Sequence, residues 1–452
     1  VMQYVVITLI GAVPKIGIYI PFWYLRLDGK NADVTWMMTG MTVLNIVLDV
    51  LFVYYLDMGV FGAGLASVLA TAAAFLFGMF RLLGRGSSYR WRLRWIRLAD
   101  WHHVASAGFP SAFNNLCATV RLLIINGMLL RHGGAGLVAI FTAVNGLSGF
   151  GDCVTLGVPA AGGVMLSVFS GEKDHGSCRL LLREEWKTGF VSGAVFLLLS
   201  LALSRVITRM YGLHGNIRIP LLWLSLSLFP ALFLNMLSTY YNMTYRNLWA
   251  NALIFLRTIL TAWIALSLTL RTGASLFSFL LTAELGAVLV WWGATGLHHR
   301  RHPSDSRYLM NDLEDEKKGR VLNFSVEADL ENIVSASERI SRFCEANGMS
   351  PRSTMRLEMS MEEVMTLIRQ VNEDRGIRDL RFDLRAYCFG AARGIRIRYS
   401  GVPFNPFVSL PESGALREDM YMGVQIIMKM VENINYQSTF GVNTLQIALK
   451  GD

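Results

Sequence analysis

Charged residues are scarce in this sequence, and the shortage is uneven. They make up 17% of the 452 residues, whereas soluble globular domains carry about 25%. Two stretches, 58–80 and 219–244, hold no charge, and two others, 35–55 and 272–297, hold one acid each. Because a helix needs roughly 20 apolar residues to cross a bilayer, the first two thirds of the chain are predicted to be a multi-pass protein of the inner or plasma membrane.

Several motifs are also missing. The five cysteines form no CxxC or Cys/His spacing, which argues against a disulfide framework and a metal site. A GxxxxGK[ST] loop is absent, which disfavours a primary ATP-driven pump. The formal net charge of +9 is explained by basic cytoplasmic loops and needs no nucleic acid.

Hydrophobic segments predict about nine transmembrane helices. We expect a break near Pro159 in the longest one. Basic clusters within 81–97 and 298–302 place both regions, and the C-terminal part of the chain, in the cytoplasm. The segments are 1–25, 35–56, 58–81, 104–130, 134–168, 188–208, 219–244, 249–270 and 272–297.

A faint repeat relates two parts of the helical region. Residues 22–52 and 238–268 align at an offset of roughly 217 residues, each preceding two hydrophobic segments. A repeat of six-helix units predicts a partial first lobe at 1–100, a full second lobe at 101–298, and three further helices upstream. Chance similarity between apolar helices is the alternative.

The composition changes after residue 298. Residues 299–320 are polar and predict a linker, and 321–452 predict a soluble α/β domain. Strands are expected at 321–327, 380–387, 394–400 and 444–449, and helices at 332–347, 353–371 and 419–432.

Residues 1–297 carry several polar and glycine positions in an ordered series. They include an Arg-x-x-Gly loop, an Asn and an Asp four residues apart, and a glycine-rich stretch: Arg26, Gly29, Asn45, Asp49, Gly59 and Gly62. The series, with AGFPSAFNNL at 107–116 and NALIFLRTIL at 251–260, resembles the multidrug and toxic compound extrusion (MATE) family of the MOP superfamily. The resemblance implies a twelve-helix, two-lobe antiporter that exports amphipathic organic compounds against a sodium or proton gradient.

Ionisable residues inside a bilayer are costly and are candidates for function. Asp49 either binds a cation or relays a proton, or it forms a packing hydrogen bond with Asn45. Asp152 and Glu284 either bind the coupling ion or pair with Arg121 or Arg257. Asn115 completes the transport candidates, because Asn114 and Asn115 stand where some MATE subfamilies carry acids.

The C-terminal domain has a resemblance of its own. The segments 355–371, 397–407 and 421–449 are similar in order and spacing to an anti-sigma-factor-type ATPase domain of the histidine-kinase group. The implied fold is a two-layer α/β sandwich, and the implied partner is a STAS-type antagonist or a sigma factor.

The nucleotide site implied by that resemblance is degenerate. Glu363 matches the base, but Leu367 stands where a magnesium-binding Asn is expected, and Leu cannot ligate a hard cation. Tyr399 replaces the Asp that reads adenine, although Gly401 matches. Gly423 is kept in the phosphate loop, but Tyr421 replaces a second glycine. We therefore expect no ATP binding, no cofactor and no catalytic residues.

These patterns lead to one leading hypothesis and two alternatives. The leading one is a secondary active transporter with a degenerate cytoplasmic regulatory domain. The alternatives are a lipid-linked oligosaccharide flippase of the same superfamily, favoured by basic residues in a central cavity, and a membrane-anchored anti-sigma-type signalling protein. A run of arginines on the soluble strands (378, 381, 385, 393, 396, 398) meets either an acidic partner, lipid headgroups or only solvent.

Overall fold

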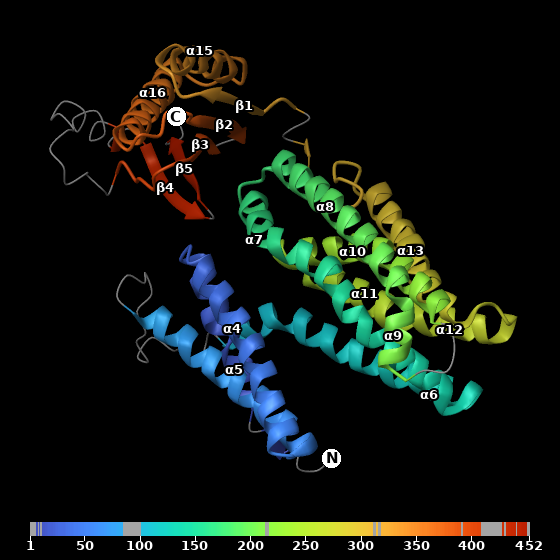
Figure 1. Cartoon of the computed structure of the whole chain (residues 1–452). Coiled ribbons are helices and arrows are strands. Elements are labelled where there is room, and N and C mark those ends of the chain that lie inside the picture. Colours follow the sequence, from blue (N-terminus) through green and yellow to red (C-terminus); the bar gives the residue numbers. More distant parts are fainter. Residues whose placement is uncertain are drawn as a thin grey trace. The chain divides into compact units, whose positions relative to one another are not determined.

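The computed structural model places three groups of elements, each with its own hydrophobic core (Figure 1). It describes residues 6–7, 9, 11–84, 101–212, 217–310, 313–314, 318–389, 392–407, 427–428, 431–439 and 441–449. Contacts separate the chain into Arg97–Glu314 and, taken together, Val1–Ile96 with Asp315–Asp452.

The N-terminal group is built on small residues. It comprises α2 (Ala12–Gly17), α3 (Tyr19–Leu27), α4 (Asn31–Asp49), the π-helix η1 (Val50–Tyr55) and α5 (Gly59–Leu83). Helix α5 buries mainly glycine and alanine, among them Ala66, Ala70 and Gly78. A Cβ on Gly78 would lie 2.5 Å from the Met37 sulfur. Close approach through small residues is how helices associate where lipid removes the hydrophobic driving force.

The second bundle surrounds one helix that is apolar on every side, α10, which contacts α6, α7, α8, α11 and α13 (Figure 1). Such a helix is expected in a protein interior, and α10 has more buried residues than its neighbours. The bundle comprises α6 (Trp101–Thr155), α7 (Gly157–Gly171), α8 (His175–Ala202), α9 (Ser204–Met210), α10 (Arg218–Met243), α11 (Asn247–Phe255), η4 (Leu256–Leu260), α12 (Thr261–Thr272), η5 (Leu276–Ser278) and α13 (Phe279–Arg301).

The number of described helices that could span a membrane, and the positions of their interruptions, differ from those of the nine predicted segments. Six described helices are long and apolar enough to cross a membrane, or seven if the bent pair α8–α9 is one span. The segments 104–130 and 134–168 join in one helical run that is interrupted at Gly133 and Gly134. The break expected near Pro159 is present at Leu156, and Pro159 itself lies in the first turn of α7, where its missing N–H has no helical partner anyway.

The polar segment after α13 folds back onto the second bundle. The Tyr241 hydroxyl donates to the carbonyl of Tyr308 at 2.7 Å, and Arg246 donates to that of Leu309 at 2.8 Å. Leu309 and Met310 belong to the core that contains Tyr241 and Trp291. The first half of the predicted linker 299–320 is therefore packed structure.

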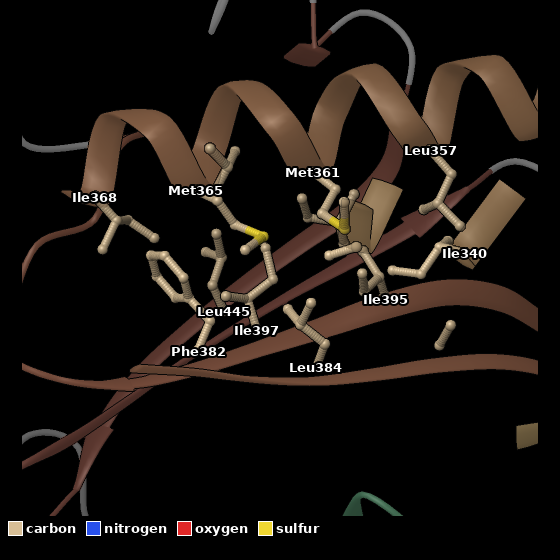
Figure 2. Packing of buried hydrophobic residues seen from close by; sticks show 14 of the residues in the cluster. Ile340, Leu357, Met361, Met365, Ile368, Phe382, Leu384, Ile395, Ile397 and Leu445 are labelled. Carbon is tan, nitrogen blue, oxygen red and sulfur yellow. The ribbon is translucent and has the colours of Figure 1, made fainter. Parts of the chain in front are cut away.

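The C-terminal domain is an antiparallel sheet of order β1-β2-β3-β5-β4 with two helices against it (Figure 1). Its elements are β1 (Val321–Glu327), α15 (Leu330–Ala346), α16 (Pro351–Asp374), β2 (Arg381–Phe389), β3 (Ala392–Ser400), β4 (Val431–Thr439) and β5 (Val442–Leu449). Figure 2 shows Leu357, Met361, Met365 and Ile368 of α16 directed at strand residues such as Phe382. These positions recur at helical spacing and define one apolar stripe.

Two expectations for this domain were met only in part. Within the helix expected at 419–432, residues 427–428 are helical, residues 431–432 belong to strand β4, and residues 419–426 and 429–430 lie outside the described residues. The arginine run is not a solvated face throughout, because Arg385, Arg396 and Arg398 are 1%, 5% and 7% exposed. Arg385 lies opposite Arg396 in the β2–β3 register and donates to Asn323 at 3.1 Å.

Candidate functional site

A cavity of about 460 Å³ lies within the second bundle. Its walls come from α6, α10, η4 and α13. Apolar residues such as Phe141 and Leu224 form part of the lining. Its polar and charged lining residues are Thr119, Arg121, Asn145, Ser148, Asp152, Thr155, Ser227, Arg257 and Glu284. A concave, partly apolar space with a few convergent polar groups is typical of a small-molecule site.

One ion pair is built into this cavity. Arg257 on η4 and Glu284 on α13 are joined by a 2.6 Å contact between Nε and Oε2. Arg257 Nη1 also donates to the side-chain oxygen of Asn235 on α10. Glu284 is only 4% exposed, so each partner would be a costly buried charge without the other. The pair ties three helical elements together at the cavity wall.

The π-helix η4 helps to place Arg257. A π-helical turn displaces backbone carbonyls from their usual donors. The Thr261 hydroxyl lies 3.1 Å from the carbonyls of both Leu256 and Arg257, to which it donates. Ser/Thr side chains can satisfy such carbonyls within a membrane, where water is absent.

Two further charges face the cavity with little local compensation. The side chain of Arg121 on α6 forms no hydrogen bond or ion pair with any residue of the described ranges, and it lines the cavity. Asp152, also on α6, accepts a hydrogen bond from Thr155 at 3.5 Å, which is long for a hydroxyl donor. Of the predicted transport residues, the structure thus gathers Asp152, Arg257 and Glu284 at one site, with Arg121.

A smaller cavity of about 110 Å³ shares Arg257 with the larger one. Its lining includes Asn114, Asn235 and Asn242. The predicted candidate Asn115 is exposed and lines neither cavity, whereas its neighbour Asn114 does. The three asparagines make this smaller cavity polar beside the ion pair.

Asn45 and Asp49 belong to the N-terminal group of helices. Asn45 donates to the Ser67 hydroxyl of α5 at 3.3 Å, so its packing bond runs between helices and not to Asp49. The Asp49 Oδ1 atom is buried and has no hydrogen-bond partner among the described residues. Asp49 immediately precedes the π-helix η1, a kind of irregularity that is frequent at functional sites.

Glu185 on α8 is an embedded acid that the sequence analysis missed. It is 6% exposed, and its Oε1 atom has no partner in the described part of the chain. A Cβ on Gly162 of α7 would lie 1.8 Å from that oxygen, so only glycine leaves it room. The charged neighbours Arg183, Glu184 and Lys187 hid this residue, because a run of charges predicts a solvated face.

Two of the residues that the resemblance assigned to a degenerate nucleotide site, Leu367 and Tyr399, lie in the C-terminal core. Leu367 is 5% exposed and packs in that core. The Tyr399 hydroxyl donates to the carbonyl of Phe404 at 2.9 Å, and burial raises the pKa of that phenol above its ordinary value. Gly401 lies against the Asn372 side chain, which a Cβ would approach within 2.2 Å.

The two other positions of that site have different outcomes. Glu363 is half-buried on α16, and burial raises the pKa of its carboxyl. Gly423 lies outside the described residues, as does Tyr421.

Comparisons with solved structures identify the fold of the helical region. An outward-facing multidrug resistance MATE family transporter of the MOP superfamily has a TM-score of 0.59 to this chain at 20% identity, over 66% of this chain and 70% of that one. A MOP superfamily transporter from Pyrococcus furiosus, described as having a binding pocket of reverse polarity, has a TM-score of 0.58 at 19% identity, over 66% and 69%.

A third solved structure, a MATE protein in complex with MaL6, has a TM-score of 0.58 at 20% identity, over 66% and 70%. No family model matches the sequence, and no curated protein does. The chain therefore has a MATE-like fold, and the fold together with its apolar helices supports a multi-pass membrane protein.

Proposed function

We propose that the chain is a secondary active transporter, an antiporter that exports amphipathic organic compounds or drugs. The observation that carries this proposal is the 460 Å³ cavity inside a bundle of apolar helices, lined by Arg121, Asp152, Arg257 and Glu284. Ionisable residues around a membrane-embedded cavity are typical of substrate and ion pathways. The MATE-like fold supports the same reading.

The coupling ion is sodium or a proton, and two carboxylates are available for it. Asp49 has a buried oxygen without a described partner, and Asp152 has one long hydrogen bond. Glu284 is the weaker candidate, since Arg257 already neutralises it. A carboxylate that is free to gain and lose a cation suits coupling, while one held in an ion pair does not.

The C-terminal domain acts, in this proposal, as a cytoplasmic regulator without ATPase activity. Leu367 and Tyr399 are packed in its core, where neither side chain can serve magnesium or adenine. A domain that keeps its fold without this chemistry suits protein binding, and its partner would be a STAS-type protein or a sigma factor. The packed segment ending in Leu309 and Met310 would carry the effect of binding to α10.

A second candidate is a flippase for lipid-linked oligosaccharides. The observation that favours it is the presence of two arginines, Arg121 and Arg257, at one cavity. Lipid-linked sugars carry phosphate groups, which arginine recognises well.

Efflux in a drug-sensitive bacterial strain expressing the chain tests the leading proposal. Cationic, zwitterionic and anionic dyes are followed with a proton ionophore or a sodium ionophore present. Efflux that collapses with one ionophore supports the antiporter and identifies the ion. A truncation after Glu314 keeps the packed segment 302–310, so a change in efflux on truncation is due to the domain. If the whole chain is well expressed and exports none of the dyes, the transporter proposal fails.

A further inference from the structure

The charges around the second-bundle cavity are unequally satisfied. Arg257 and Glu284 neutralise each other at 2.6 Å, and Asn235 accepts a further bond from Arg257. Arg257 and Glu284 are therefore charge-compensated by each other, although the Arg257 guanidinium keeps further N–H donors that no described side chain uses. The remaining charges, Arg121 and Asp152, both belong to α6 and both line the cavity.

Arg121 is the charge whose partner is missing. It has no hydrogen bond or ion pair with another residue in the ranges that the structure describes, and it interacts with Glu284, Arg257 and Asp152 only at longer range. Removing a guanidinium from bulk water is costly unless hydrogen-bond acceptors replace the water. At longer range the carboxylates of Glu284 and Asp152 offset part of that cost, and the positive charge of Arg257 adds to it. The site therefore favours an incoming group with negative charge.

We propose that Arg121 binds an anionic group, a carboxylate or a phosphate, on the transported amphiphile. The inference rests on the proposed transport function and names the substrate class of the same cavity. The planar guanidinium presents parallel N–H donors that match the two oxygens of either group. The apolar lining, including Phe141 and Leu224, accepts the remainder of the molecule, and a cavity of 460 Å³ falls within the range that holds drug-sized ligands.

Asp152 limits the selectivity of the site. Its carboxylate repels a purely anionic ligand and attracts a cationic group on the same molecule. A ligand with both charges satisfies both side chains. Zwitterions are therefore preferred to simple anions, and simple anions to simple cations, because Asp152 already accepts a hydrogen bond from Thr155 whereas the Arg121 side chain has no such partner among the described residues.

Binding to the full chain in detergent tests the proposal without any gradient. The probes are dansylglycine, which carries a carboxylate, and a dansyl amide with a quaternary ammonium group. We expect tighter binding of dansylglycine to the wild type. Arg121→Gln should weaken dansylglycine binding by about ten- to a hundredfold, as expected for loss of a hydrogen-bonded charge. Arg121→Lys should lose less, since the charge remains without the planar fork.

Two further variants keep the test sharp if Arg121→Gln is poorly folded. Asp152→Asn should bind dansylglycine roughly two- to tenfold more tightly, because a repelling charge is removed. Arg271→Gln is the matched control, because Arg271 is exposed at the end of α12 and does not line the cavity. Unchanged affinity in both Arg121→Gln and Asp152→Asn, or a wild-type preference for the quaternary probe, overturns the proposal.

Nanodiscs separate the two sources of the anionic group. If phosphatidylglycerol displaces dansylglycine from wild type while phosphatidylcholine does not, the group belongs to a lipid. If neither displaces it, the group belongs to a free amphiphile. Arg121-dependent binding without gradient-driven efflux would retain the anion site and reject the transporter proposal. Gradient-driven efflux that is unchanged in Arg121→Gln would retain the transporter proposal and reject the anion site.

Discussion

Two helix pairs of this chain share a plan but hold different polar contacts. The first pair is α4–η1 with α5, and the second is α11–η4–α12 with α13. Each first member contains a π-helix. By the offset of roughly 217 residues predicted from the sequence, Ser67 corresponds to Glu284, whereas Arg257 corresponds to Gly40 and not to Asn45. Ser67 accepts a hydrogen bond from Asn45 at 3.3 Å, whereas Glu284 holds Arg257 at 2.6 Å.

The difference separates a neutral link from an ionic one. Hydrogen bonds between membrane helices contribute about 0.6 kcal/mol on average, whereas loss of one partner of a buried ion pair costs about 3–5 kcal/mol. The ionic link lies at a cavity wall, and the neutral link does not line the described cavities. Similar helix pairs can thus serve packing alone or packing together with a charged site.

Glu284→Gln should have the largest effect on stability. It leaves Arg257, whose side chain is 20% exposed, without its counter-charge, so we expect a loss toward the lower end of about 3–5 kcal/mol, measured by denaturant titration in micelles. The double variant Arg257→Leu with Glu284→Leu should lose much less, because no unpaired charge remains. A single variant as stable as wild type would show that the pair is not a structural link.

Asp49→Leu should increase the stability of the first pair, whereas Glu284→Gln lowers that of the second. It removes a charged side chain with an unpartnered buried oxygen, so we expect a gain of about 1–3 kcal/mol in the same titration. Efflux measured in parallel distinguishes two roles for Asp49. Loss of ion-coupled efflux identifies an ion site, and unchanged efflux rejects that role.

Ser67→Ala should have a smaller effect. It removes the acceptor for Asn45 and should cost about 0.6 kcal/mol. Thr71→Val is a suitable control, because the Thr71 hydroxyl bonds only within its own helix, to the Ser67 carbonyl at 2.7 Å. A loss as large as that of Glu284→Gln would remove the contrast between the pairs.

Glu363→Gln should have the smallest effect and provides a reference outside the helix pairs. Burial raises the pKa of the Glu363 carboxyl, so the folded domain holds this proton more tightly than the unfolded chain. The stabilisation is complete below the unfolded pKa of about 4.3 and is lost as pH rises through the folded value. Scanning calorimetry should show a shallower decline above about pH 4 in the variant, and an identical slope would contradict the assignment.

Sequence patterns predicted much of the fold because they depend on local periodicity. The elements β1, α15, α16, β2, β3 and β5 lie within a few residues of the ranges expected for them. Strand β4 was not predicted, since its formation depends on pairing with β5 and not on a local pattern. The π-helices were missed as well, because neither composition nor spacing marks a changed hydrogen-bond register.

For the site, the sequence predicted which charged residues could take part but not how they are arranged. The scarcity of charge marked Asp152, Arg257 and Glu284 as candidates, but it left open which residues pair. Pairing of Arg257 with Glu284, and the missing partner of Arg121, depend on how α6, η4 and α13 meet. Glu185 and the buried Arg385 were misjudged for the same reason, since burial by distant segments leaves no local pattern.

Substituted-cysteine labelling at Ser148 tests the central claim most directly. Ser148 lines the cavity, and Leu289, which is 68% exposed on α13, serves as the lipid-facing control. In a chain with its five native cysteines replaced by alanine, Ser148→Cys should react with a membrane-impermeant maleimide, and an exported compound should slow the reaction. Leu289→Cys should not react. Failure of Ser148→Cys to react, or a reaction rate that the compound leaves unchanged, would contradict a substrate site in this cavity.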